Sequence, residues 1–220
     1  MTLRELIDLI SRKLDDVVQP FLWDDTELTQ AINDRINELC EKTGLLRDSS
    51  TVAICTIAVV LGTAKYALDD RIIKILSVKY GTSYTELYPV TRAYLDEQFQ
   101  NWESDTGVPR YFLLDDTATI TLYPNPSADS HIHLSVTRYP LVQMTLLSEN
   151  LEPEIHWKYH SRLVDGVLAL AYEKNDSETI ALARVKHHEA LWNKTIDEIH
   201  QGEANYYNYG TVLAPALGNI

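Results

Sequence analysis

Residues 107–140 constrain the fold most, because this stretch of the chain is unsuited to a helix. It predicts three strands, at residues 111–114, 117–123 and 131–139, which are rich in β-branched and aromatic side chains. Asp115 with Asp116 forms one expected turn, and the proline-containing residues 124–127 form the next. Because turns this short join antiparallel neighbours, the sequence predicts a three-stranded meander with one buried face.

Amphipathic helical patterns precede this β stretch. Thr2 with Glu5, and Asp24 with Glu27, have the spacing of capping boxes, which begin helices. The first pattern continues toward Pro20 and the second stops at Gly44. Both helices have an apolar face too wide to leave in water, so the sequence predicts a helical hairpin that needs further helices to cover it.

A second helical hairpin is expected after the β stretch, with its first helix beginning at Pro153 and its second ending at Gly202. The predicted fold class is therefore α+β: a four-helix bundle from the N- and C-terminal helical hairpins, an inserted antiparallel β module and an extended C-terminal arm. The expected domains are residues 1–50 (N-terminal hairpin), 51–150 (β-rich module with one short helix), 151–202 (C-terminal hairpin) and 203–220 (the C-terminal arm).

The formal net charge of -13 and the cysteine content exclude some classes of protein. An acidic body argues against a nucleic-acid reader, which needs Lys and Arg to neutralise phosphates. No apolar run approaches the roughly 20 residues that span a bilayer, so we expect no membrane partner. Cys40 and Cys55 lack CxxC spacing, which indicates two ordinary thiols in a reducing cytoplasm.

The C-terminal arm, residues 203–220, has no amphipathic period, yet it is rich in tyrosine and aliphatic side chains. This composition is typical of a segment that becomes ordered on a partner surface. The alternative is a tail that folds back on its own bundle. The candidate docking residues are Tyr206, Tyr207, Tyr209, Val212, Leu213, Pro215 and Leu217.

Histidine pairs are the candidates for metal chemistry. His156 and His160 have the i, i+4 spacing that can bring two imidazoles to one metal ion on a helix. The motif reads HWKYH rather than HExxH, and no further ligand completes a set. We therefore expect no metal site, no cofactor and no catalytic residues, with a metal-dependent hydrolase as the alternative.

Several short motifs carry a resemblance to a known family. They are GTAKYALDD at residues 62–70, RIIKILSV at 71–78, GVPRYF at 107–112, ITLYPNP at 120–126 and RYP at 138–140. Together with the final helical hairpin, this order resembles the head–tail adaptor (connector) proteins of tailed bacteriophages, especially short-tailed phages. The resemblance covers most of the chain up to about Gln201.

The resemblance implies a non-enzymatic structural protein of the virion, located at the head–tail interface and assembled in the bacterial cytoplasm. It implies a ring of twelve copies beneath the portal protein, which extends the DNA channel and provides the attachment platform for the tail nozzle or tail tube. Genomic DNA would then pass close by without specific contacts. A monomeric, host-directed binding module remains a further alternative.

Overall fold

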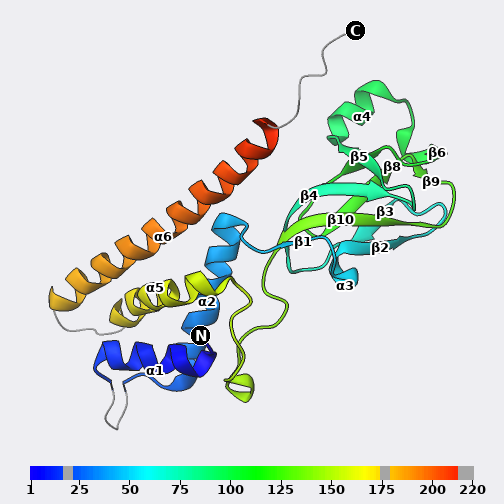
Figure 1. Ribbon diagram of the computed structural model, residues 1–220. Helices are drawn as coiled ribbons and strands as arrows, with labels where there is room; N and C mark the ends of the chain where they lie inside the picture. Colours follow the sequence, from blue (N-terminus) through cyan, green and yellow to red (C-terminus); the bar gives the residue numbers. More distant parts are fainter. Residues whose placement is uncertain (17–21, 174–178, 213–220) are drawn as a thin grey trace. The chain divides into compact units, whose positions relative to one another are not determined.

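A computed structural model describes residues 1–16, 22–173 and 179–212 of the chain (Figure 1). The chain divides into two compact units. The helical unit comprises Met1–Leu45 and Pro140–Ile220, and the β unit comprises Leu46–Tyr139. The helical unit is therefore built from both ends of the sequence.

The first helix, α1 (Leu3–Leu14), begins with the predicted capping box. The Thr2 hydroxyl accepts a hydrogen bond from the Glu5 amide (3.3 Å), and the Glu5 carboxylate accepts one from the Thr2 amide (3.0 Å). The helix ends earlier than the sequence pattern suggested, at Asp15, whose φ of 59° is left-handed. Leu3, Leu6, Ile7 and Ile10 form its buried face.

The second helix, α2 (Asp25–Thr43), also follows the prediction. Asp24 and Glu27 form its capping box, and it ends at Gly44, which adopts a φ of 63°. A glycine there costs little because it has no Cβ to clash in the left-handed region.

The C-terminal helices differ from the prediction at both ends. A 3-10 turn, η3 (Trp157–Tyr159), precedes α5 (His160–Glu173), so the helix expected to begin at Pro153 starts seven residues later. α6 (Thr179–Val212) continues through Gly202 instead of stopping there. The prediction of an extended arm that begins at residue 203 is therefore wrong for residues 203–212, which are helical. One interior glycine costs a helix only about 1 kcal/mol, and no proline follows until position 215.

The predicted four-helix bundle with an inserted antiparallel β module is wrong. A bundle needs helices of comparable length packed about 20° from parallel. Here α1, α2, α5 and α6 have 12, 19, 14 and 34 residues. Figure 1 shows α2 crossing α1 and α5 rather than running alongside them.

The β unit contains a large curled sheet of eight strands rather than a small module. The strand order is β1-β10-β4-β5-β7-β8-β3, with β2 also paired to β10, and only β5 and β7 run parallel. A second, two-stranded parallel sheet joins β6 and β9. The strand bounds are β1 Arg47–Asp48, β2 Thr56–Val59, β3 Lys65–Ala67, β4 Ile72–Tyr80, β5 Thr85–Pro89, β6 Thr106–Gly107, β7 Tyr111–Leu113, β8 Thr119–Tyr123, β9 Asn125–Pro126 and β10 Ser130–Arg138. Its short helices are α3 Val52–Cys55, α4 Arg92–Gln98 and η1 Trp102–Ser104.

Only half of the predicted meander is confirmed. β7 and β8 form the expected antiparallel pair, with Phe112 opposite Leu122. β10 does not continue the meander but pairs with β4, with Leu134 opposite Val78. The chain between β8 and β10 is used by β9, which pairs with β6 and so separates the two strands.

Candidate docking surfaces

A narrow stripe of buried side chains on α6 packs against the other helices of the helical unit. Val185, Trp192, Ile196 and Ile199 are buried, at the three-, four- and seven-residue spacings that place side chains on one helix face. Ile199 is the last side chain of α6 shown to be buried in the part of the helix with described side chains. The helix nevertheless continues for thirteen residues, to Val212.

Trp192 is the centre of this attachment. Its indole Nε1 donates a hydrogen bond to Glu38 Oε2 of α2 at 3.0 Å, and the Arg35 guanidinium lies 5.7 Å from the ring centroid. Arg35 Nε also donates to the carbonyl oxygen of Gly166 in α5 (2.9 Å). A Cβ at Gly166 would lie 2.8 Å from the Trp192 ring, so only glycine permits this approach. Side chains of α2 and the backbone of α5 therefore meet the indole of α6 at one point.

The charge of Glu38 is stabilised within this contact. Burial acts to raise the pKa of its carboxyl, but hydrogen bonds from Lys42, Arg35 and Trp192 outweigh burial and the pKa is lowered. Lys42 Nζ lies 2.6 Å from Oε1, and an Arg35 terminal nitrogen lies 2.5 Å from Oε2. Glu38 is therefore ionised at neutral pH, and its carboxylate remains the hydrogen-bond acceptor for the Trp192 indole.

The predicted docking residues fall in two groups. The first group belongs to the helical backbone of α6 and comprises Tyr206, Tyr207, Tyr209 and Val212. The second group lies outside the described residues and comprises Leu213, Pro215 and Leu217. Their docking role stays a prediction. A signal for the longer helix was present in the sequence, because Trp192, Ile199 and Tyr206 follow one another at intervals of seven.

The two histidines of the alternative metal site, His156 and His160, are engaged in separate contacts. His160 is buried, its Nε2 lies 2.9 Å from the carbonyl oxygen of Ile155, and its Nδ1 lies 2.8 Å from the Met1 amine. Since a carbonyl oxygen only accepts, Nε2 carries the hydrogen and Nδ1 is the acceptor. His156 lies before α5, where its ring accepts from the Lys158 amide. The expected i, i+4 pair on one helix does not form.

The other histidine pairs also contact protein groups. On β10 the rings of His131 and His133 stack at 6.5 Å, and His133 contacts Tyr84 at 4.6 Å. His188 Nδ1 lies 3.1 Å from the Asp165 carboxylate. Among residues 1–16, 22–173 and 179–212, no three His, Cys, Asp or Glu side chains are placed to hold a metal ion together.

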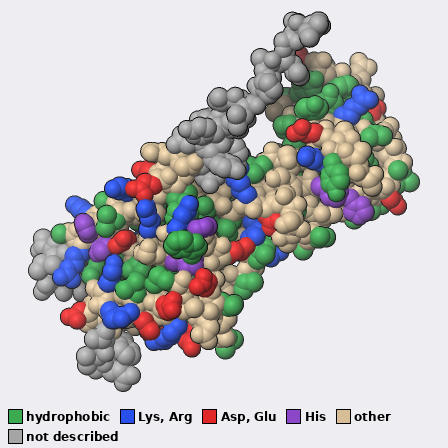
Figure 2. Space-filling view, in the orientation of Figure 1, with side chains coloured by type: hydrophobic (Ala, Val, Ile, Leu, Met, Phe, Trp, Pro, Cys, Tyr) green, Lys and Arg blue, Asp and Glu red, His purple; other side chains and the backbone are tan. Residues whose placement is uncertain are grey.

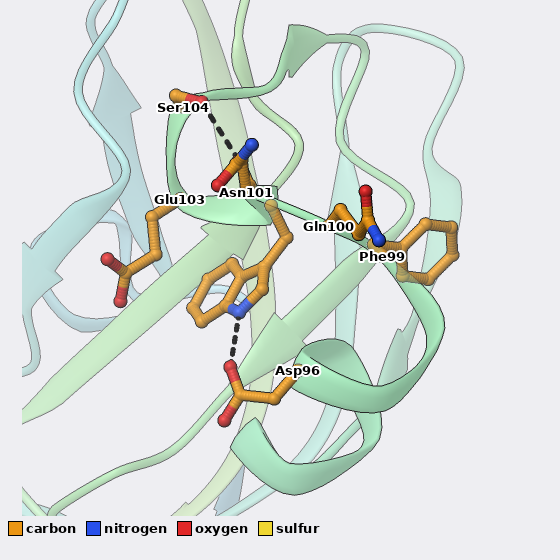
Figure 3. Close-up of a pocket in the computed structure, with 7 residues that line it drawn as sticks. Asp96, Phe99, Gln100, Asn101, Glu103 and Ser104 are labelled. Carbon is orange, nitrogen blue, oxygen red and sulfur yellow. Dashed lines mark hydrogen bonds between the residues drawn. The ribbon is translucent and has the colours of Figure 1, made fainter.

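An open pocket of about 470 Å³ in the β unit is lined by residues that hydrogen-bond to one another (Figure 3). Trp102 Nε1 donates to Asp96 Oδ1 at 2.7 Å, and the Ser104 hydroxyl donates to the Asn101 carbonyl oxygen at 2.9 Å. Arg92 lies 5.2 Å from the centroid of the Trp102 ring. These contacts fix the turn after α4. The residues that line the pocket are Asp96, Phe99, Gln100, Asn101, Trp102, Glu103 and Ser104.

Tyr123 supports the same turn from β8. Its ring meets Trp102 edge-on with centroids 5.8 Å apart, and its hydroxyl donates to Asp105 Oδ2 at 3.0 Å. Burial, followed by the bond to the Asp105 carboxylate, raises the pKa of Tyr123 to about 12. The phenol therefore stays protonated and acts as a hydrogen-bond donor in a packed aromatic cluster.

In a comparison with models of protein families, the model described as SU10 adaptor protein matches residues 1–215. The chain belongs to the SU10 adaptor protein family. A comparison with curated proteins finds no match. Membership confirms the resemblance to phage adaptors, and it gives this SU10 adaptor protein a structural role as a component of the virion.

The two units of the SU10 adaptor protein differ in charge. Residues 46–139 contain eleven acidic and eight basic side chains, whereas the rest of the chain contains twenty-one acidic and eleven basic ones. The helical unit therefore has a net charge of -10 and the β unit -3. None of the helices in the described part of the chain is long and apolar enough to cross a bilayer.

Proposed function

We propose that this SU10 adaptor protein assembles as a ring of twelve copies beneath the portal of a tailed phage. In this position the ring extends the DNA channel and provides the platform to which the tail nozzle attaches. The observation that carries the proposal is the family match over residues 1–215, together with the adaptor-like motifs of the β unit. The match includes both units, so both are part of the proposed adaptor.

The charge distribution supports a channel through which DNA passes without being held. DNA-binding proteins gain affinity when Lys and Arg neutralise phosphates and release counterions. The net charge of -10 on the helical unit acts against such binding. A ring that presents acidic surfaces to the channel would therefore let the genome slide through.

The C-terminal arm supports the attachment. Tyr206, Tyr207 and Tyr209 can bury large rings while their hydroxyl groups remain hydrogen-bonded, a combination favoured at interfaces. Val212, Leu213 and Leu217 add aliphatic surface, and Pro215 reduces the entropy lost on ordering. The arm would contact the portal or a neighbouring copy.

Negative-stain imaging of the protein mixed with the portal protein of the same phage tests the ring. We expect the free chain to be mostly monomeric in sedimentation velocity and to form a ring on the portal, because closure before the portal is present would compete with ordered assembly. A stable monomer without affinity for the portal would instead indicate the host-directed binding module. A stable ring without portal would contradict the proposed order.

Deleting residues 203–220 is expected to leave the melting temperature nearly unchanged and to weaken attachment to the portal severely. The truncated chain retains all the buried apolar side chains in the part of α6 whose side chains are described, namely Val185, Trp192, Ile196 and Ile199. Thermal unfolding and co-sedimentation with the portal measure the two effects.

The matched control is Tyr88→Ala, which removes a tyrosine that is 62% exposed on the β unit and should bind the portal normally. A truncated chain that melts much earlier would mean that residues 203–220 stabilise their own unit. Unchanged portal affinity would contradict the docking role.

A further inference from the structure

The segment between β10 and α5 exposes a group of large apolar side chains in the helical unit. The side chain of Leu147 is fully exposed (101%), and those of Trp157 and Val142 are 72% and 68% exposed. Figure 2 shows hydrophobic side chains over the turn η2 (Leu146–Ser148) and the chain beside it. We call this group the apolar loop surface. It comprises Val142, Leu146, Leu147, Leu151 and Trp157.

The backbone beneath the apolar loop surface is fixed by hydrogen bonds to two helices. Asn33 of α2 donates to the Met144 carbonyl oxygen and accepts from the Met144 amide, both at 2.9 Å. The amides of Leu3 and Arg4, at the start of α1, donate to carbonyl oxygens of Leu151 and Glu149. The exposed side chains therefore extend from a backbone that is already fixed, and this lowers the conformational entropy lost when a partner binds.

The two ends of this segment are also tied together. The Leu141 amide donates to Glu154 Oε2 at 2.7 Å, which brings the start of the segment to the approach of α5. Trp157 follows there, with its ring 5.5 Å from that of His156. Val142 and Trp157 thus extend from two closely held parts of the backbone.

Residues 213–220 have the composition to cover such a surface. They read LAPALGNI, with Leu213, Leu217 and Ile220 as large apolar side chains. No charged side chain occurs from Ala204 to Ile220. The segment can therefore approach the acidic helical unit without repulsion between side chains. Eight extended residues reach about 27 Å, enough to contact several side chains of the surface.

The course of α6 favours a second copy as the source of this segment. After Ile199 the helix rises for thirteen residues, or about 20 Å, before residue 213. In Figure 1 the red end of α6 lies on one side of α5 and η2 lies on the other. The chain's own end is thus carried away from its own apolar loop surface.

We propose that residues 213–220 of one copy dock on the apolar loop surface of a second copy. The contact joins two different patches, and such a contact closes a ring when the rotation between neighbouring copies divides a full turn evenly. This inference rests on the proposed ring, and it assigns residues 213–220 of the C-terminal arm to a neighbouring copy rather than to the portal.

A photocrosslinking amino acid at position 217 tests the contact in the assembled ring. Light and isotopically heavy full-length chains are mixed with portal protein, irradiated, and analysed by mass spectrometry. We expect cross-links between light and heavy chains that reach residues 142–157. Cross-links confined to single chains, or directed to the portal or to another part of the adaptor, would overturn the proposal.

Leu147→Asp provides an independent measurement. The variant should melt like the original chain, because the side chain is fully exposed, and should weaken ring assembly by roughly tenfold or more. Leu182→Asp is the matched control, since Leu182 is 61% exposed on α6 and lies outside the apolar loop surface. This control variant should assemble normally. If the original chain forms rings and the Leu147→Asp variant forms them equally well, the proposed docking of residues 213–220 is wrong but the proposed ring is not. If the original chain forms no ring, the proposed function is wrong as well.

Discussion

Replacing Trp192 by alanine is expected to lower the free energy of unfolding of the helical unit by about 3–5 kcal/mol. The side chain is 1% exposed, so its removal leaves a cavity between α2, α5 and α6. It also removes the hydrogen bond to Glu38 and the contact with Arg35. Urea unfolding followed by circular dichroism at the helical band measures the loss.

Two variants make this prediction specific. Trp157→Ala removes the same side chain from a site that is 72% exposed, so it should change the free energy of unfolding by less than about 0.5 kcal/mol. Gly166→Ala should destabilise, although alanine favours helices, because its Cβ would press on the Trp192 ring. A stabilised Gly166→Ala variant would show that α5 and α6 do not pack this closely.

Replacing Asp48 by asparagine is expected to destabilise the β unit by about 3–5 kcal/mol, the cost of breaking a buried ion pair from one side. The side chains of Asp48 and Arg138 are 4% and 7% exposed, and Arg138 Nε donates to Asp48 Oδ2 at 2.7 Å. The same oxygen accepts from the Thr51 hydroxyl at 2.6 Å. An asparagine amide nitrogen in place of this oxygen would be a donor facing two other donors, Arg138 Nε and the Thr51 hydroxyl, so both hydrogen bonds would be lost.

The pH dependence of unfolding gives a second test of Asp48. Burial acts to raise the pKa of this carboxyl, but hydrogen bonds from Thr51, Ser50 and Arg138 lower the pKa well below its usual range. A depressed native pKa adds stability above the pKa of the unfolded chain, about 4, and this stability is lost as the pH falls below that value. Between pH 5 and 2 the original chain should therefore lose more stability than Asp48→Asn.

A more exposed ion pair provides the matched control. Asp69 and Arg71 lie 2.8 Å apart, with side chains 23% and 38% exposed. Asp69→Asn should cost about 1 kcal/mol or less, since solvent screens such pairs. Equal losses from Asp48→Asn and Asp69→Asn would contradict the importance of burial.

Local signals in the sequence predicted local structure well. Both capping boxes and the end of α2 at Gly44 depend on residues within one helical turn, and all three are confirmed. The β7–β8 pair is likewise confirmed, because the turn that joins the strands is short. The adaptor resemblance is also confirmed, since its motifs are linear in the sequence. The seven-residue spacing that continues to Tyr206 was equally local, and it indicated a longer α6 than the expected end at Gly202.

The sequence by itself determined the mixture of helices and strands, the caps and the family, because each depends on neighbouring residues. Tertiary structure decided the rest. The pairing of β10 with β4 joins residues more than fifty positions apart, and an alternating apolar pattern does not specify which strand it meets. The helices cross instead of forming a bundle, and Gly166 shows one reason. The absence of a side chain there admits the Trp192 ring between α5 and α2, a fit that exists only once the three helices are packed.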